Sequence, residues 1–243
     1  MLTVAELLTV QRGIYDEPRG LDRFKTYIRE LTAGTDEMVL PITAQNPMGR
    51  EHCAASLDRL MELGAEDLAR DAAARFEAQR APIGDYRIGL VVADDARGGW
   101  TDRDLTEIAH RFEPKAELKR GWITVHFYTG DFAGDRPSAD DVRSEVLATL
   151  ARRAAWLEHG PVSTLRDRMA REGAAASFAG MTEPRFDDAT VHDIRAKIAP
   201  HLDTETFSDL FSCLYGDEAA ERVGYPAMGL PRCAGYAVAL ADA

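Results

Sequence analysis

The glutamate Glu172 lies in the stretch RMAREGAAASFAG (168–180), directly before a glycine and a run of small residues. A carboxylate in this setting can bind zinc, or it can lie on the solvated face of a helix. Two arginines, Arg152 and Arg153, stand earlier in the chain. An arginine stays protonated, so it pairs with a carboxylate and does not bind a metal. If Arg152 or Arg153 lies beside Glu172 in the fold, the two can form an ion pair. The alternative is that all three side chains are solvated.

His126 is the histidine best placed for general-base chemistry. It belongs to the segment GWITVHFYTG, whose alternation predicts a strand with Trp122, His126 and Tyr128 on one face and aliphatic residues on the other. The face that carries His126 could line a cleft. The six histidines of the sequence include no pair four residues apart, which is the commonest zinc-binding spacing on a helix. The candidate catalytic residues are therefore His126 and Glu172.

Asp94 and Asp95 follow the apolar segment YRIGLVVA, at the predicted end of a strand, where ligand crevices often form in α/β arrangements. Gly98 and Gly99 would let a backbone approach a ligand there, although no Gly-Lys-Ser/Thr phosphate loop follows. One interpretation is a strand-to-helix turn capped by Thr101. The other is a site in which Asp94 or Asp95 binds a metal or a cationic group.

The segment NPMGREHC brings Glu51, His52 and Cys53 together in sequence. Adjacent residues on a helix point in different directions, so we expect no metal site here. Cys53, Cys213 and Cys233 are odd in number and widely spaced, which favours buried reduced thiols over disulfides or a zinc knuckle.

The composition excludes several classes of protein. The chain has 243 residues, with 45% hydrophobic and 29% charged residues, which is typical of a globular protein. Its formal net charge of −12 repels phosphate backbones, so nucleic acid is not an expected partner. We find neither a signal peptide nor an apolar run long enough to cross a membrane, and we expect a cytoplasmic protein.

Hydrophobic periodicity predicts the elements that must position these residues. Strands are expected at 86–93 and 121–130. Helices are expected at 2–14, 21–33, 50–63, 65–80, 101–113, 138–158, 162–179, 188–201, 204–215, 217–223 and 232–242. This pattern predicts a helix-rich α+β protein with a small, two- to four-stranded sheet packed on long helices. Residues 1–82 form a helical N-terminal region and 83–243 an α+β region. We expect one compact unit, because no flexible linker separates the two.

The segments VLATLARRAAWLEHGP and LRDRMAREGAAASFAG, with LPRCAGYAVALA near the end of the chain, resemble the C-terminal half of zincin-type metalloproteases. The resemblance covers residues 86–243 and points in particular to small predicted zinc-protease families of bacteria. Those families carry His-Glu-x-x-His on a long helix, and a second helix supplies the third zinc ligand from a Glu-Gly motif. The resemblance thus implies a zincin-like fold in which Glu172 holds the position of that third ligand.

The sequence departs from this family where the motif would stand, because it has Arg152-Arg153-Ala154-Ala155-Trp156 there. Both histidine ligands and the general-base glutamate are missing, and zinc needs neutral imidazole or anionic ligands. The resemblance therefore implies a metal-free site, in which an ion pair of Glu172 with Arg152 or Arg153 stands where the metal would be. We expect no metal and no cofactor.

Three functions remain as predictions. The first is a non-catalytic, degenerate metalloprotease domain that binds a small molecule or a protein partner. The second is a hydrolase of another type that uses His126 with Asp94, Asp95 or Glu172. The third is a helical interaction module that forms a homodimer. The predicted ligand-binding cleft consists of Asp94, Asp95, Trp100, Trp122, His126, Arg152, Arg153, Trp156, Glu172 and Tyr236.

Overall fold

The computed structural model describes residues 1–96, 99–181 and 186–243. They divide into two compact units. Unit 1 comprises Met1–Thr106 with Pro114–Leu150, and unit 2 comprises Glu107–Glu113 with Ala151–Ala243. The expected N-terminal region 1–82 lies within unit 1, and its status as a domain stays a prediction.

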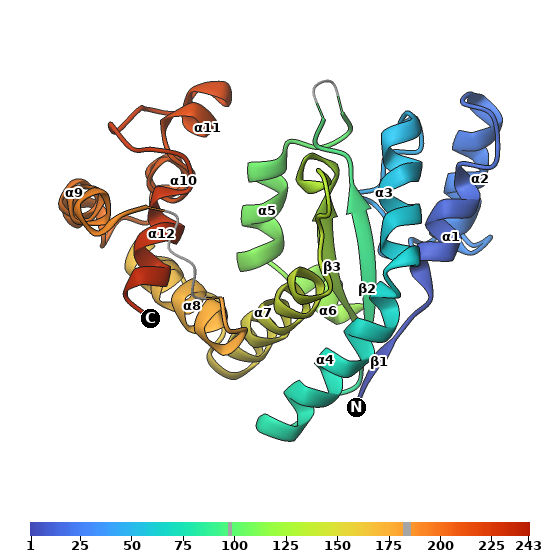
Figure 1. The fold of residues 1–243 in the computed structure, drawn as a ribbon, viewed down its shortest axis with the longest axis horizontal. Coiled ribbons are helices and arrows are strands. Elements are labelled where there is room, and N and C mark those ends of the chain that lie inside the picture. The colour runs from blue at the N-terminus through green and yellow to red at the C-terminus, as the bar shows by residue number, and fades with distance from the viewer. Residues whose placement is uncertain (97–98, 182–185) are drawn as a thin grey trace. The chain divides into compact units, whose positions relative to one another are not determined.

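Unit 1 contains a three-stranded parallel sheet in the order β1-β2-β3 (Figure 1). The strands are β1 (Leu2–Val4), β2 (Tyr86–Ala93) and β3 (Trp122–Tyr128). Ile88 in the central strand pairs with Val4 on one side and with Ile123 on the other. Parallel pairing aligns the carboxyl ends of β2 and β3, so the residues that follow both strands meet at one edge of the sheet.

The prediction of the two long strands is confirmed, but the expected helix at 2–14 is wrong at its start. Residues 2–4 form β1 instead of the first turn of a helix, since they pair with Tyr86, Arg87 and Ile88. On the other long strand, Trp122, Thr124 and Tyr128 of β3 are buried, and the cleft that this face was expected to line with His126 stays a prediction. Strands of parallel sheets are commonly covered on both faces in this way.

The helices of unit 1 pack on this sheet or, in the case of α2, on α1. They are α1 (Leu7–Ile14), α2 (Leu21–Thr32), α3 (Glu51–Glu62), α4 (Ala65–Gln79) and α6 (Lys115–Lys119). A short 3₁₀ helix, η1 (Thr129–Asp131), follows β3. The division between the units falls within two helices, α5 (Arg103–Phe112) and α7 (Ala139–His159).

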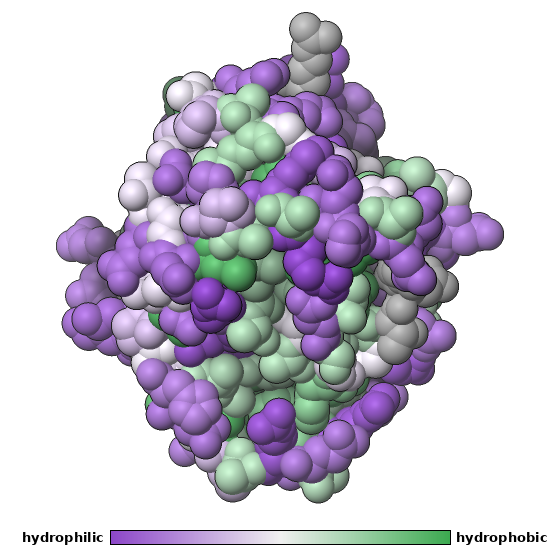
Figure 2. Space-filling view, turned by 90° about the vertical axis from the view of Figure 1, so that its left-hand side faces the viewer, coloured by the Kyte–Doolittle hydropathy of each residue, from purple (hydrophilic) through white to green (hydrophobic). Residues whose placement is uncertain are grey.

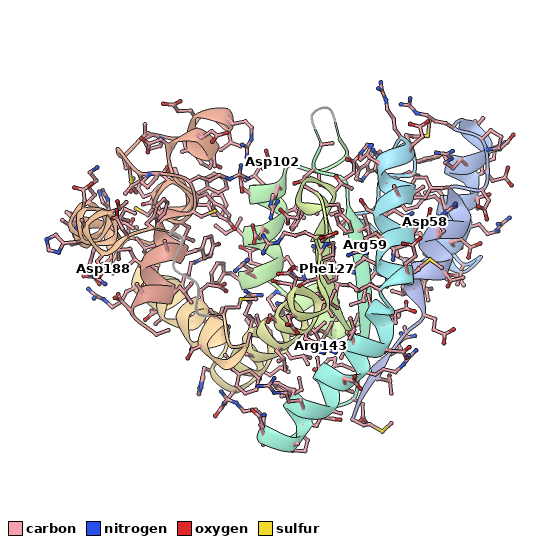
Figure 3. All side chains as sticks on the ribbon, in the orientation of Figure 1. Asp58, Arg59, Asp102, Phe127, Arg143 and Asp188 are labelled. Atoms are coloured by element: carbon pink, nitrogen blue, oxygen red, sulfur yellow. The ribbon has the colours of Figure 1, made fainter. Side chains whose placement is uncertain are left out.

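Helix α3 is held on two opposite sides within unit 1. Asp58 and Arg59 are neighbours on this helix and point to opposite sides of it (Figure 3). Asp58 accepts a hydrogen bond of 2.6 Å from Arg12 Nε on α1, and Arg59 donates one of 2.9 Å to the Asp135 carbonyl. These contacts help to fix the position of α3, whose first turn carries His52 and Cys53.

Unit 2 is helical in the part that the structure describes. It contains α8 (Leu165–Phe178), α9 (Asp188–Ile198), η2 (Ala199–His201), α10 (Phe207–Tyr215), α11 (Asp217–Arg222) and α12 (Ala234–Ala241). Helix α12 packs on α8 (Figure 1), with Gly173 of α8 against the backbone carbonyl of Ala239. Helix α12 carries Gly235 and Tyr236, so this Gly-Tyr segment lies close to the helix that carries Glu172.

With twelve α-helices and three strands in its described residues, the chain has the predicted helix-rich α+β class. No described helix is long and apolar enough to cross a membrane.

Helix starts follow the local sequence. Ser138 and Asp141 cap α7 reciprocally, with Ser138 N donating to Asp141 Oδ2 and Asp141 N donating to Ser138 Oγ. Thr164 caps α8 by accepting a hydrogen bond from Asp167 N. The expectation of Thr101 as the cap of α5 is wrong. The Asp102 side chain accepts from the backbone of α5 instead, and Thr101 donates to the Asp94 carbonyl.

Candidate functional site

Glu172 lies at the centre of a buried ion-pair cluster in unit 2. Only 3% of the residue is exposed. Arg152 Nε lies 3.0 Å from Glu172 Oε1 and 3.1 Å from Oε2. Arg111 Nη1 donates to the same carboxylate. The predicted ion pair of Glu172 with Arg152 is therefore confirmed, and the alternative of a solvated carboxylate is wrong.

The cluster continues through Arg111 towards two tyrosines. Arg111 also pairs with Glu107, one turn earlier on α5, and its guanidinium lies 4.8 Å from the centre of the Tyr236 ring. Tyr236 donates a hydrogen bond of 2.8 Å to Tyr215. Burial raises the pKa of both phenols, so they stay protonated at neutral pH. The charges of two acids and two arginines thus compensate one another, next to two neutral tyrosine side chains.

Sequence reasoning missed Arg111 and Glu107. Their spacing of four residues on a predicted helix indicated a pair with one another. Nothing in the sequence indicated that Arg111 would contact Glu172. The two residues are 61 positions apart, and local spacing does not relate residues so far apart in the chain.

Arg153 and Trp156 also stand in the segment where the zinc-binding motif would lie. Arg153 is fully buried, and its Nη2 lies 2.8 Å from His110 Nε2. Trp156 is half-buried. Arg153 thus contacts the histidine on α5, and the arginine of this pair whose contact with Glu172 is described above is Arg152.

The residues of this cluster do not fit a zinc ion. Zinc is held by neutral or anionic nitrogen, sulfur and oxygen donors, and the two side chains nearest to Glu172 are cations. Among the described residues, the group of three or more His, Cys, Asp and Glu donors close enough for a metal lies in unit 1. Helix α8 itself carries two further arginines, Arg168 and Arg171, and burial lowers the pKa of each. The electrostatics of this region therefore suit an anionic group.

A second polar cluster lies in unit 1, where Asp94 follows β2. His52 Nε2 is 2.9 Å from Asp94 Oδ1 and 3.3 Å from Cys53 Sγ. The donor atoms of these three residues all lie within 4.8 Å of one another. The expectation that His52 and Cys53 diverge is wrong, because both residues belong to the first turn of α3, which points at the end of β2. Glu51 is exposed and takes no part in the group.

Asp94 is held in place by several donors. Asn46 Nδ2 donates to Oδ2 at 2.7 Å, and Ala96 N donates to Oδ1 at 3.2 Å. Burial opposes ionisation of Asp94, but the hydrogen bonds from His52 and Asn46 outweigh it, so its pKa is lowered. Burial raises the pKa of the Cys53 thiol to about 12. The cluster therefore holds an ionised carboxylate beside a protonated thiol.

The other predicted site residues of unit 1 are dispersed. The Asp95 carboxylate accepts from Gly130 N at 2.7 Å and from Thr129 Oγ1 at 3.0 Å, and Arg103 approaches it at 3.4 Å. Trp100 is 48% exposed. Gly98 lies outside the described residues.

His126 is half-buried and lies edge-on to the Tyr128 ring at 6.2 Å. The histidine that contacts Asp94 is His52. The pairing of His126 with Asp94, Asp95 or Glu172, on which the hydrolase alternative depends, therefore stays a prediction.

A pocket of about 390 Å³ lies beside the first turn of α3 in unit 1. Tyr15, Arg19, Arg23, Gly49, Arg50, Glu51 and Ala54 line it. A second, smaller pocket lies between residues of α1 and α2. Neither is lined by any of the ten residues of the predicted cleft.

Apolar residues also reach the surface. Figure 2 shows the side of the molecule on which α9 lies, and apolar residues gather there between hydrophilic ones. Leu157 and Phe207 are exposed apolar side chains of unit 2. Such surface is compatible with the interaction module and the homodimer, which stay predictions.

Residues 151–240 match a family model described as a predicted Zn-dependent protease (DUF2268). The match includes Arg152, Glu172 and Tyr236. The resemblance to predicted zinc proteases is thereby confirmed for this part of the chain, whereas residues 86–150 of the expected range lie outside the match. No curated protein and no solved structure matches the chain.

Proposed function

We propose that residues 151–240 are a degenerate, non-catalytic member of the predicted zinc-protease family that they resemble. In this proposal an ion-pair cluster stands at the position of the metal site. The observation that carries the proposal is the buried carboxylate of Glu172, which both Arg152 and Arg111 contact.

The chemistry of the cluster supports this proposal. A catalytic zinc in such a site activates water and needs ligands that donate electron pairs, together with a general base. Guanidinium groups donate hydrogen bonds and carry no available lone pair. A zinc ion at Glu172 would displace two arginines from a buried carboxylate and leave their charges uncompensated, which is strongly unfavourable.

A domain without catalytic residues can still function by binding a partner. We propose that the chain binds a small molecule or a protein partner. The buried arginines near α8 favour an anionic group on that partner, because the guanidinium atoms Nε and Nη1 of Arg168 have no hydrogen-bond partner among the described residues.

Metal content and peptidase activity of the purified chain test the proposal. The variant Cys53→Ser serves as the background, since it removes the thiol of the cluster in unit 1. We expect this variant to retain no stoichiometric zinc after incubation with zinc and desalting. We also expect no cleavage of casein or of a mixed peptide library, with or without added zinc.

Two further variants make the result specific to the Glu172 cluster. Glu172→Gln removes the carboxylate, and Glu158→Gln changes an exposed glutamate of α7 as a matched control. One zinc per chain that Glu172→Gln loses and Glu158→Gln retains would overturn the proposal. Zinc-dependent peptide cleavage with the same pattern would do so as well.

A further inference from the structure

We infer that His52, Cys53 and Asp94 form a zinc-binding site in unit 1, with His52 Nε2, Cys53 Sγ and Asp94 Oδ1 as three protein ligands. These residues lie outside the segment that matches the protease family. The inference is therefore independent of the proposed function of residues 151–240.

The donor set and its spacing fit zinc. Nitrogen, sulfur and carboxylate oxygen are the three donor types that zinc accepts in proteins. Tetrahedral bonds of about 2.0–2.3 Å place neighbouring donors about 3.3–3.8 Å apart. The observed separations are 2.9 Å between His52 Nε2 and Asp94 Oδ1 and 3.3 Å between His52 Nε2 and Cys53 Sγ. All three donor atoms lie within 4.8 Å of one another, so small side-chain movements would bring them to the spacing that the ion needs.

The geometry distinguishes a metal site from a nucleophilic triad. In a Cys-His-Asp triad the two ring nitrogens have different partners, one facing the nucleophile and the other the carboxylate. Here a single nitrogen, His52 Nε2, faces both Cys53 Sγ and Asp94 Oδ1. Three donor atoms that converge on one point, with no relay through the ring, suit a cation at that point.

The surroundings orient the ligands. Asn46 holds the second oxygen of Asp94, which leaves Oδ1 directed at His52, and Thr129 Oγ1 lies 3.3 Å from Oδ1. Such outer contacts fix ligand orientation in metal sites. Gly49 allows the approach of Cys53, since a Cβ at position 49 would lie only 2.4 Å from the sulfur, so any side chain there would force the sulfur to move.

Charge and access agree with this assignment. A thiolate and a carboxylate together neutralise the two charges of zinc, so the filled site is neutral at its centre. The side chain of His52 is 41% exposed, whereas Cys53 and Asp94 are buried. The ion would thus enter from the solvent side of His52, and its fourth position would stay open to water or to a small ligand.

Metal titration of the full chain tests the inference. We expect one equivalent of Zn²⁺ to bind, and one equivalent of Co²⁺ to give the near-ultraviolet absorption of a cobalt–thiolate bond. His52→Gln and Cys53→Ser are each expected to lower zinc affinity by more than about 100-fold, and Asn46→Ala by about 10- to 100-fold. Cys213→Ser and His159→Gln, which change a cysteine and a histidine outside the cluster, are the matched controls.

The outcomes separate clearly. Absence of stoichiometric metal in the wild type overturns the inference, as does metal binding that survives both His52→Gln and Cys53→Ser. A cobalt complex without thiolate absorption also overturns it. Because Cys53 is buried, thermal unfolding of each variant shows whether it is folded, and the half-exposed His52 supplies a variant that leaves the core intact. Zinc held by these residues would leave the proposal for Glu172 standing, and zinc held by Glu172 would contradict only that proposal.

Discussion

At the scale of single residues, Glu172 is a buried charge in the interior of unit 2. Its carboxylate is buried, and two arginines from different helices contact it. Removing one member of a buried pair leaves the other charges uncompensated. We therefore expect Glu172→Gln to lower the free energy of unfolding by about 3–5 kcal/mol, measured by urea denaturation.

The matched control for this substitution is Glu158→Gln on α7. Glu158 is exposed and pairs only loosely with His159, at 3.6 Å. Its loss should change the free energy of unfolding by about 0.5 kcal/mol or less. A loss below about 1 kcal/mol for Glu172→Gln would mean that its carboxylate is solvated, against the contacts described above.

Asp217 is a second residue whose charge acts on structure. Its carboxylate accepts hydrogen bonds from the backbone nitrogens of Met228, Gly229 and Leu230 at 2.8–3.1 Å. Burial opposes its ionisation, but these hydrogen bonds outweigh it and lower its pKa. Asp217→Asn is expected to cost about 1–2 kcal/mol at neutral pH in urea denaturation.

The pH dependence of this effect has a definite sign. A carboxyl with a lowered folded-state pKa stabilises the fold above its unfolded pKa of about 3.9. That contribution is lost as the pH falls through the folded pKa. The difference between wild type and Asp217→Asn should therefore shrink below about pH 4. A difference that stays constant from neutral to acid pH would contradict the role given to the charge. Asp203→Asn, at an exposed ion pair with Arg166, is the control.

At the scale of elements, the contact of α8 with α12 depends on Gly173. A Cβ at this position would lie 2.4 Å from the backbone oxygen of Ala239. Backbone cannot move aside cheaply, so Gly173→Ala forces the two helices apart and should cost about 1–3 kcal/mol in thermal or urea denaturation.

Gly13 in α1 provides the matched control for this helix contact. Nothing lies within 4 Å of a Cβ built there. Since alanine favours a helix over glycine by about 1 kcal/mol, Gly13→Ala should be neutral or stabilising. Equal effects of the two substitutions would show that helix propensity, and not the contact with α12, decides the result.

The elements themselves were largely predictable, because their signals are local. The continuous apolar run of residues 86–93 gave a strand with the same ends as β2, and the helical stripes placed most helices to within a few residues. Strand β1 was missed for a physical reason. Three residues carry too short a pattern to specify a strand, and they adopt one only because Tyr86–Ile88 pairs with them.

At the scale of the whole molecule, the net charge of −12 disfavours binding to nucleic acid. A surface with this balance repels the phosphate backbone, and the counterion release that drives non-specific binding needs clustered cations. We expect no retardation of a duplex DNA fragment by the protein at concentrations up to about 100 µM in about 0.15 M salt. A complex that weakens steeply as salt is raised would contradict this expectation.

The sequence by itself determined the class of the fold, most of its helices, two of its strands, and the pairing of Glu172 with one of the two arginines Arg152 and Arg153. Each of these follows from spacing along the chain or from the exchange of metal ligands for cations. The tertiary structure alone decided what lies together across long stretches of chain. It brought Arg111 of α5 to Glu172, and it directed His52 and Cys53 at Asp94, 42 residues after His52. These long-range contacts depend on how helices pack and on how parallel strands align. The hydrophobic periodicity of one segment does not specify which other segments pack against it.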